Sequence, residues 1–495
     1  MFSWLKDICK DIKDLNFSVD KYTKDSIIQS LPTVASVNRA KKLIENKKFD
    51  EAEIILKKAL DISQQDSKVY KYLGKISERR LNFAEAIEYY QKSSKLNPHD
   101  KEIWLRLGMS QLNNQMIEEA VTSFEQADKI TPLNTDVYTG WGMALMKQKK
   151  YALARDKFLS ASKISKYNFT AILLSAIMEI RLQDYDSAEM KLQFLAKVAP
   201  NESSTYEYSK LKLLKSDYDS AIRYAHKAIE INKQMLPAYF ILGEVYSIKK
   251  DKDKTNQIFE KALKNDLDST TTRFEWGKAY VRLFEFQKAK EQFTLSLEKD
   301  NTNTDAKIGL ALVNAYENNF EYLNELKEKY GNNVYIEEAL GLEKLNSQQY
   351  EDAIDFFKKA LRTDPKQSYN YYNLVLAYKG LNDNYKIREY FEKFTRDNPN
   401  YIQGFIDFGK WLIDVEDYAD AQRKLRRAEK LDPNNVEVLN LLFLTLYTLV
   451  IKNVCEYNIR ETISIAEKAK NLGQFLYEDK NKELENILND IQGRK

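Results

Sequence analysis

Small and apolar residues recur along this chain in a fixed order, with a spacing of 34 residues broken only by single steps of 33 and 30. An anchor position, usually alanine, is followed four residues later by a mostly large apolar residue. A second small or apolar residue usually follows three residues after that. Spacings of three and four residues place side chains on one face of an α-helix. The anchors are Ala52, Ala86, Ala120, Ala154, Ala188, Ala221, Thr255, Ala289, Leu323, Ala353, Ile387 and Ala421.

A second periodic position lies twelve residues before each anchor and is mostly glycine or alanine. Glycine inside a helix costs roughly 1 kcal/mol relative to alanine, so its repeated use predicts that another helix approaches closely there. Proline recurs twelve residues after several anchors, where it ends one helix before the next repeat. The pattern therefore predicts an all-α fold of stacked helical hairpins. The hairpins begin near residues 33, 67, 101, 135, 169, 202, 236, 270, 304, 334, 368 and 402.

The third repeat carries the fullest set of these positions: Trp104, Leu107, Gly108, Ala120, Phe124, Ala127 and Pro132. In this pattern, across residues 33–435, the chain resembles the tetratricopeptide-repeat (TPR) family. The resemblance implies an α-α superhelix, a right-handed TPR solenoid of about 12–13 helical hairpins with capping helices at both ends. It implies little about the partner, because members of this family bind many unrelated proteins.

The register divides the chain into four segments. In order these are an amphipathic capping or tether helix at residues 1–32, twelve TPR-like repeats at 33–435, a degenerate thirteenth hairpin with an apolar helix at 436–476, and a C-terminal capping helix at 477–495.

The ninth repeat, at about residues 304–333, departs most from the pattern. It has Leu323, Lys327 and Tyr330 where most other repeats have Ala, Phe and Ala. A repeat without its large packing residue buries less apolar surface against its neighbours. We therefore expect a local bend or a softer segment there.

The first 32 residues predict a helix with Leu5, Ile8 and Ile12 on one face. One interpretation is a cap that covers the open end of the stack. The other is a tether to a membrane or a partner, aided by Phe2 and Trp4. Lysine and aspartate alternate on the polar face, which weakens the case for an anionic membrane, so any membrane contact is expected to be peripheral.

Residues 438–451 are apolar on nearly all faces. The segment is short for a membrane span and is interrupted by Asn440, Thr445 and Thr448. Three interpretations remain open at this point. The helix is buried by its neighbours, it forms an oligomer or partner surface along Val438–Ile451, or it enters a membrane.

Composition favours no particular charged partner. The chain of 495 residues has 77 basic and 74 acidic residues, a net charge of +3, so we expect no nucleic-acid partner. Its two cysteines, Cys9 and Cys455, are too far apart in the sequence to indicate a disulfide scaffold or a metal site. Together with the lack of a secretory signal, they predict a cytoplasmic protein.

Motifs for enzymatic chemistry are not found. The sequence has neither of the glycine-rich phosphate-binding motifs and no G-x-S-x-G nucleophile elbow. His99 and His226 are far apart in the sequence, and both are expected to face solvent. We therefore expect no enzymatic activity, no metal and no cofactor.

The family resemblance implies that the first helix of each repeat lines a concave groove. At the inward positions, the second and third repeats carry a series of basic residues, here called the basic ladder: Lys68, Lys71, Lys75, Arg79 and Arg106. Such residues hold an acidic peptide or a terminal carboxylate, or they form an ordinary solvated face. Both interpretations stay open from the sequence.

The resemblance also allows one specific ligand to be tested. The clamp that some family members use for chaperone tails needs Lys and Asn, then Asn, then Lys and Arg on three successive first helices. Lys71 matches, but Lys75 and Arg106 replace the asparagines, and Asp136 and Gly140 stand where Lys and Arg belong. We therefore do not expect capture of chaperone tails.

A second candidate groove site lies in the eleventh repeat, at Tyr369, Tyr372, Asn373 and Leu376. Asparagine can pair with a peptide amide in both directions, and tyrosine supplies a rigid contact surface. Ordinary packing between repeats is the alternative interpretation.

The sequence thus predicts a protein-interaction scaffold or adaptor that binds partner peptides or domains in its groove. Two alternatives remain: a helical-repeat RNA-binding protein, and a membrane-peripheral assembly scaffold tethered through its N-terminal helix. The balanced charge argues against the RNA-binding alternative.

Overall fold

The computed structural model describes residues 21–321, 323–331, 333–452 and 455–493. These residues form helices and no strand, which confirms the predicted all-α fold of helical hairpins. The chain divides into two units, Met1–Leu211 and Lys212–Lys495, which are described separately. Residues 1–20, where most of the predicted N-terminal amphipathic helix falls, lie outside the described part of the chain.

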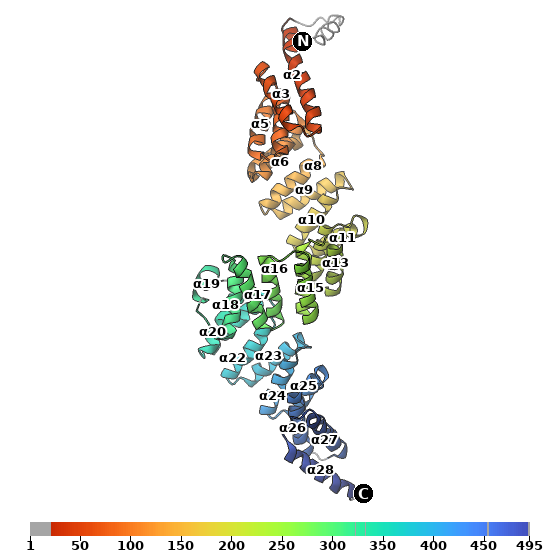
Figure 1. Ribbon diagram of the computed structural model, residues 1–495, viewed down its shortest axis with the longest axis vertical. Coiled ribbons are helices and arrows are strands. Elements are labelled where there is room, and N and C mark those ends of the chain that lie inside the picture. Colours follow the sequence, from red (N-terminus) through yellow and green to blue (C-terminus); the bar gives the residue numbers. More distant parts are fainter. Residues whose placement is uncertain (1–20, 322, 332, 453–454, 494–495) are drawn as a thin grey trace. The chain divides into compact units, whose positions relative to one another are not determined.

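Unit 1 (Met1–Leu211) is a stack of hairpins in which even-numbered helices are the first helices of the repeats (Figure 1). Its last helix, α12, crosses into the next unit. The helices are α2 (Lys21–Glu45), α3 (Phe49–Ile62), α4 (Ser67–Arg79), α5 (Phe83–Leu96), α6 (Lys101–Asn113), α7 (Ile117–Ile130), α8 (Thr135–Lys147), α9 (Tyr151–Ile164), α10 (Phe169–Arg181), α11 (Tyr185–Val198) and α12 (Glu202–Leu214).

Unit 2 (Lys212–Lys495) continues the same alternation. Its helices are α13 (Tyr218–Ile231), α14 (Leu236–Ile248), α15 (Lys252–Lys264), α16 (Thr270–Arg282), α17 (Phe286–Lys299), α18 (Thr304–Tyr316), α19 (Leu323–Tyr330), α20 (Val334–Asn346), α21 (Tyr350–Thr363), α22 (Tyr369–Gly380), α23 (Asn384–Asp397), α24 (Ile402–Asp414), α25 (Tyr418–Leu431), α26 (Val436–Lys452), α27 (Glu456–Asn471) and α28 (Glu478–Gly493).

The periodic glycines make room for the aromatic ring of the second helix of the same repeat. A Cβ atom added to Gly74 would lie 2.7 Å from the Tyr90 ring, and one added to Gly142 would lie 2.6 Å from the Phe158 ring. Tyr90 and Phe158 are fully buried. The helices therefore pack closely at these positions, and each ring fills the space that the missing side chain leaves.

Each of the first helices from α2 to α24 is followed by a turn residue with positive φ, a common way to close a helix. These turn residues are Lys47, Leu81, Gln115, Lys149, Gln183, Ser216, Lys250, Phe284, Asn318, Gln348, Asn382 and Glu416. In unit 2, Lys250 and Phe284 occupy equivalent turns of neighbouring repeats, and the Lys250 Nζ lies 3.6 Å from the centre of the Phe284 ring. This contact brings the edges of the two repeats together.

The ninth repeat has a shortened second helix. α19 has 8 residues, whereas the second helices α17 and α21 on either side have 14 each. Leu323 and Leu326 are its buried residues. Because this helix is short and lacks the large aromatic, an apolar hollow of about 300 Å³ remains between α18 and α19, beside Leu310, Ala311 and Leu326.

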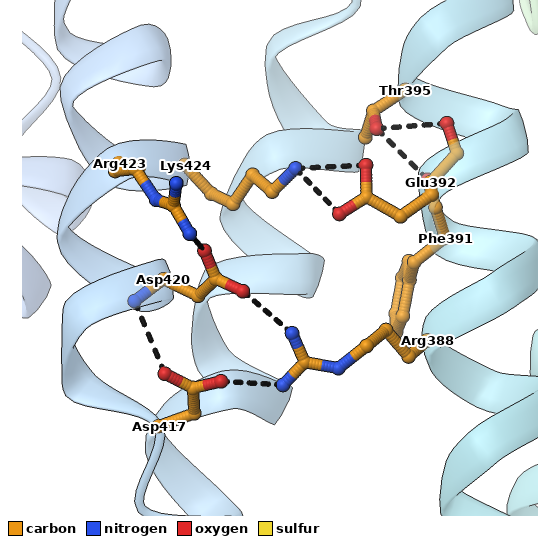
Figure 2. A network of polar contacts seen from close by, with 8 residues as sticks. All are labelled: Arg388, Phe391, Glu392, Thr395, Asp417, Asp420, Arg423 and Lys424. Atoms are coloured by element: carbon orange, nitrogen blue, oxygen red, sulfur yellow. Dashed lines mark hydrogen bonds and ion pairs between the residues drawn. The ribbon is translucent and has the colours of Figure 1, made fainter.

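Ion pairs connect the second helices of neighbouring repeats. Arg388 on α23 donates to both Asp417 and Asp420 at 2.5 Å, and Lys424 on α25 donates to Glu392 at 2.9 Å (Figure 2). Partly exposed ion pairs contribute little stability individually. A guanidinium that spans two carboxylates nevertheless fixes geometry, so this network sets the register of α25 on α23.

The apolar helix α26 is packed by α27 and α28. Leu442 and Phe443 on α26 are fully buried with Ile459 and Ala466 on α27 and Leu484 on α28. Among the described residues, every helix is too short or too polar to span a bilayer. The structure therefore places α26 in a protein core formed with its neighbours.

Candidate functional site

In the described part of each unit, three successive first helices form a groove. In unit 1 a groove of about 480 Å³ runs across α4, α6 and α8, and is called the α4–α6–α8 groove. In unit 2 a groove of about 280 Å³ lies among α18, α20 and α22, and is called the α18–α20–α22 groove. Both grooves lie on the face formed by the first helices, where the sequence predicted the binding surface.

The α4–α6–α8 groove combines apolar and charged side chains. Half-buried Leu105, Met109 and Met143 supply its apolar surface. Methionine is flexible and polarizable, and it adapts to different bound side chains. The polar groups of the groove are Glu78, Glu102, Arg106, Ser110, Asn113, Asp136 and Thr139.

Lys71 and Lys75 of the basic ladder are paired with carboxylates of the next repeat. The Lys71 Nζ lies 2.7 Å from Asp100 and 3.5 Å from Glu102, and the Lys75 Nζ lies 2.7 Å from Glu102. The lysine side chains are only 13% and 17% exposed. Their charges are therefore largely neutralised within the protein.

Arg106 belongs to the same network. Its Nε donates to Glu102 at 2.8 Å, and its Nη1 donates to Glu78 at 3.1 Å. Burial acts to raise the pKa of Glu102, but hydrogen bonds from Lys75 and Arg106 outweigh it and lower this pKa to about 2. Glu102 is thus a stable anion at the centre of the network.

The remaining ladder residues lie apart from this network. Lys68 and Arg79 are exposed, and neither lines the groove. Of the five ladder residues, only Arg106 contributes to the groove surface. The ladder is therefore not a continuous free cationic strip.

Sequence reasoning missed the acidic side of this network. Glu102 occupies the same repeat position as Lys68, one repeat later, and Asp136 occupies it again in the following repeat. Comparison of equivalent positions between neighbouring repeats would have shown this change from a basic residue in the second repeat to acidic residues in the third and fourth repeats. Met109 and Met143 could have been found from the same periodicity.

Gly140 stands where the chaperone-tail clamp would need arginine. A Cβ atom added to Gly140 would lie 2.7 Å from the Phe124 ring and 3.0 Å from the Met109 sulfur. The ring of the preceding repeat therefore fills this position, which leaves no room for a long basic side chain without repacking.

The second predicted site is partly assembled in the α18–α20–α22 groove. Tyr369, Asn373 and Leu376 line it. Tyr372 does not, and its hydroxyl donates to Asp407 at 2.9 Å. Asn373 is 1% exposed and donates from Nδ2 to the Tyr316 hydroxyl at 3.0 Å, while its Oδ1 has no hydrogen-bond partner among the described atoms.

Tyr369 also takes part in an aromatic cluster within unit 2. Its ring centre lies 4.7 Å from that of Phe284, 5.4 Å from Phe286 and 5.6 Å from Tyr316. The Phe284 ring lies 4.8 Å from Tyr401. The cluster connects the turn after α16 with α22 and with the loop before α24, so much of Tyr369 serves internal packing.

Comparisons with protein-family models match parts of the chain. A model described as "Tetratricopeptide repeat" matches residues 236–269 and 338–367. A model described as "Tetratricopeptide repeat protein 21 C-terminal ARM domain" matches residues 30–137. The matches thus fall in both units.

Similar curated proteins share about a quarter of their aligned residues with this chain. BBSome complex member BBS4 of Bos taurus is 24% identical over 275 residues, which are 46% of this chain and 53% of that protein. Protein O-mannosyl-transferase TMTC3 of Homo sapiens is 24% identical over 260 residues, 50% of this chain and 28% of that protein. Hsp70-Hsp90 organizing protein 2 of Arabidopsis thaliana is 23% identical over 234 residues, which are 45% of this chain and 34% of that protein. The chain therefore spans about half or less of these relatives.

A solved structure similar over nearly the whole chain supports the fold. The crystal structure of the APC/C hetero-tetramer Cut9-Hcn1 aligns with 90% of this chain and 95% of that chain. The TM-score is 0.50 at 12% identity, so the similarity concerns the fold alone.

Proposed function

The chain belongs to the tetratricopeptide-repeat family, and from this premise we propose that it is a non-enzymatic scaffold. In this proposal it binds an extended segment of a partner protein in the α4–α6–α8 groove. The observation that carries the proposal is the groove itself, which has half-buried Leu105, Met109 and Met143 beside hydrogen-bonding groups. An apolar surface with a few polar groups is the usual construction of a binding site.

The chemistry of the groove favours recognition by apolar contact. Lys71, Lys75 and Arg106 already have carboxylate partners. An acidic peptide would have to displace those partners, which would cost much of the energy gained. Exposed Asn113 can instead pair with a peptide backbone in both directions, and the apolar side chain of the peptide would lie between Met109 and Met143.

The named relatives fit a scaffold role. Two of them are called a member of a complex and an organizing protein for two chaperones. For this chain we propose assembly of proteins without chaperone-tail capture, because Gly140 faces the Phe124 ring at the position where the clamp would need a basic residue. A cytoplasmic location is part of the proposal, and the exposed free thiol of Cys455 agrees with a reducing compartment.

The groove can be tested with a random peptide library selected on the full chain. Peptides that bind the wild type should bind Met143→Lys at least about tenfold more weakly, because the charge enters the apolar surface. The control is Met190→Lys on α11, where the methionine is 68% exposed and outside the groove. Binding should be unchanged in that variant.

Two results would overturn the proposal. One is that the selected peptides bind Met143→Lys as tightly as they bind the wild type. The other is that no peptide is enriched while unstructured RNA binds in a strongly salt-dependent manner at physiological ionic strength, which would favour the RNA-binding alternative.

A further inference from the structure

A small cavity in unit 2 is surrounded by cationic side chains. It encloses about 160 Å³ and lies where the turns after α14 and α16 meet the loop before α22. Lys250 comes from the turn after α14, Arg282 is the last residue of α16, and Lys366 comes from the loop before α22. Ser368 and Asn398 add a hydroxyl and an amide group. Residues that are distant in the sequence therefore meet at one polar site.

Arg282 is almost wholly buried and incompletely paired. Its side chain lines the cavity, the residue is 8% exposed, and its Nε has no hydrogen-bond partner among the described atoms. Its ion pair with Glu244 is long, with 3.9 Å between Nη2 and Oε1. A buried charged donor without an acceptor costs free energy, which a ligand that supplies the acceptor would recover.

Lys250 lacks a carboxylate partner among the described residues. Its Nζ donates to the backbone oxygen of Arg282 and lies 3.6 Å from the centre of the Phe284 ring. Burial, and then the nearby charge of Arg282, lower the pKa of Lys250 to about 7. Arg282 and the protonated form of Lys250 thus face the cavity, and among the described residues that line it Asp397 is the one carboxylate.

The carboxylates near the cavity already accept hydrogen bonds, and for Glu244 the donor is Lys366, which itself lines the cavity. These carboxylates are Glu244, Glu275, Asp364 and Asp397. In the same order, they accept hydrogen bonds from Lys366 at 3.3 Å, from Lys278 at 2.8 Å, from the Lys366 backbone at 3.0 Å and from Arg396 at 3.0 Å. The other titratable groups are the phenols of Tyr218, which lines the cavity, and Tyr335, which faces Arg282.

We propose that this cavity binds a tetrahedral oxyanion, a phosphate or sulfate group, between Lys250 and Arg282. Lys366 and the Ser368 hydroxyl are the further donors. The Ser368 hydroxyl donates to Asn398 Oδ1 at 3.0 Å and would turn toward a bound anion. The proposal is independent of the peptide groove, which lies in unit 1.

The size of the cavity limits the ligand. Its 160 Å³ equals the share of liquid volume of about five water molecules. That space holds one tetrahedral group with a few waters. The bound anion would bridge the α14 and α16 turns to the loop before α22, and so would stabilise unit 2.

The first test is calorimetric titration of the full chain with sodium sulfate and with inorganic phosphate. We expect saturable binding of both anions. Lys250→Met should weaken binding at least about tenfold, because it removes a charge-assisted hydrogen bond. Lys249→Met is the matched control, since Lys249 is exposed and pairs outward with Asp219 at 2.6 Å. Its affinity should equal that of the wild type.

The second test measures sulfate binding as a function of pH. Sulfate is used because its own charge does not change between pH 6 and pH 9. The anion favours the charged form of Lys250, so binding should be accompanied by proton uptake at pH 8. Sulfate affinity should fall between pH 6 and pH 9 in the wild type and change little in Lys250→Met. If Lys250→Met does not fold, Lys366→Gln, whose parent side chain is 34% exposed, gives the affinity test.

A further ligand, O-phosphoserine, distinguishes a free anion from a phosphate carried on a larger molecule. O-phosphoserine binding more weakly than phosphate indicates a free anion, and tighter binding indicates a phosphate carried on a larger molecule; both support the site. Three results would overturn it. They are the absence of sulfate and phosphate binding up to about 10 mM, equal affinity in the Lys250 and Lys366 variants, and binding of acetate as tight as that of sulfate.

Discussion

Burial sets the charge of Glu338 near neutral pH. It lies on α20, is 1% exposed, accepts a hydrogen bond from the Tyr316 hydroxyl and accepts another from Asn370 Nδ2 at 2.9 Å. Burial raises its pKa from 4.5 to about 7, although the two hydrogen bonds act in the opposite direction. The folded-state pKa therefore exceeds the unfolded-state pKa. The stability that Glu338 contributes is present below pH 4.5 and is lost as pH rises through about 7.

Glu338→Gln should remove this pH dependence, because glutamine resembles the protonated acid. We expect the variant to be more stable than the wild type at pH 8 by up to about 3 kcal/mol. At pH 4.5 the difference should be small or reversed. Urea unfolding at several pH values measures this difference in the free energy of unfolding. The control is Glu351→Gln, at an exposed position on α21. A difference between Glu338→Gln and wild type that does not vary with pH would contradict this account.

The repeat register decides which residues lie on the groove face, whereas peptide binding by these residues stays a prediction. Tyr369 and Asn373 were placed on the groove face from their repeat positions, and they do line a groove. Their partners Phe284 and Tyr316 could not be predicted, because these contacts join different repeats across unit 2. The pairing of Lys75 with Glu102 has a shorter range and could have been read from neighbouring repeats.

Helix pairing depends on contacts between glycine and an aromatic ring, and Gly108 offers a direct test. A Cβ atom added to Gly108 would lie 2.8 Å from the Phe124 ring, which is fully buried. Alanine gains about 1 kcal/mol of helix propensity, but overpacking typically costs about 1–3 kcal/mol. Since the Phe124 ring also fills the space beside Gly140, we expect Gly108→Ala to lower the free energy of unfolding by about 1 kcal/mol.

The control for this change is a double-mutant cycle with Phe124→Leu, measured by chemical denaturation. The smaller side chain should accept the new methyl group, so Gly108→Ala should be neutral or stabilising in that background. If Gly108→Ala stabilises the otherwise wild-type chain by the full propensity gain, close packing is not the reason for this glycine.

Most helix boundaries could be predicted because the signals that set them are local. First helices begin at Ser67, Lys101 and Thr135, where the register placed repeat starts. The N-terminal region differs, since α2 runs without interruption from Lys21 to Glu45 through the expected start at residue 33. The helix continues through Pro32, although proline inside a helix removes one backbone hydrogen bond. The sequence predicted weak packing in the ninth repeat, but it did not predict that α19 would be short.

Long-range contacts within unit 2 distinguish it from a simple stack in which each repeat contacts only its neighbours. Lys366 donates to Glu244 at 3.3 Å across 122 positions of the sequence. The Phe284 ring lies 4.7 Å from Tyr369 and 5.9 Å from Phe394. These contacts join the repeats before the ninth repeat to those after it, so unit 2 does not depend on α19 alone for its continuity.

Native-state hydrogen exchange by mass spectrometry can separate the contribution of α19 to the stability of unit 2 from that of the long-range contacts. α19 buries only Leu323 and Leu326 beside an apolar hollow, whereas α17 and α21 each bury a phenylalanine fully. Local opening of α19 therefore exposes little apolar surface, and its amides should exchange faster than those of α17 and α21. Equal protection of the three helices would contradict the expectation of a softer ninth repeat.

Phe284→Ala tests whether the long-range cluster holds unit 2 together across that soft repeat. The substitution removes ring contacts to Tyr369, Phe394 and Tyr401 and should lower the stability of unit 2 by about 2 kcal/mol. Exchange should become faster in α20 and α22, on the far side of α19, as well as in α16. Peptides from α4 to α7 serve as the internal control, because they belong to unit 1 and should not change. Faster exchange confined to α16 and α17 would mean that only neighbouring repeats are coupled, and that the aromatic cluster does not connect the two sides of the ninth repeat.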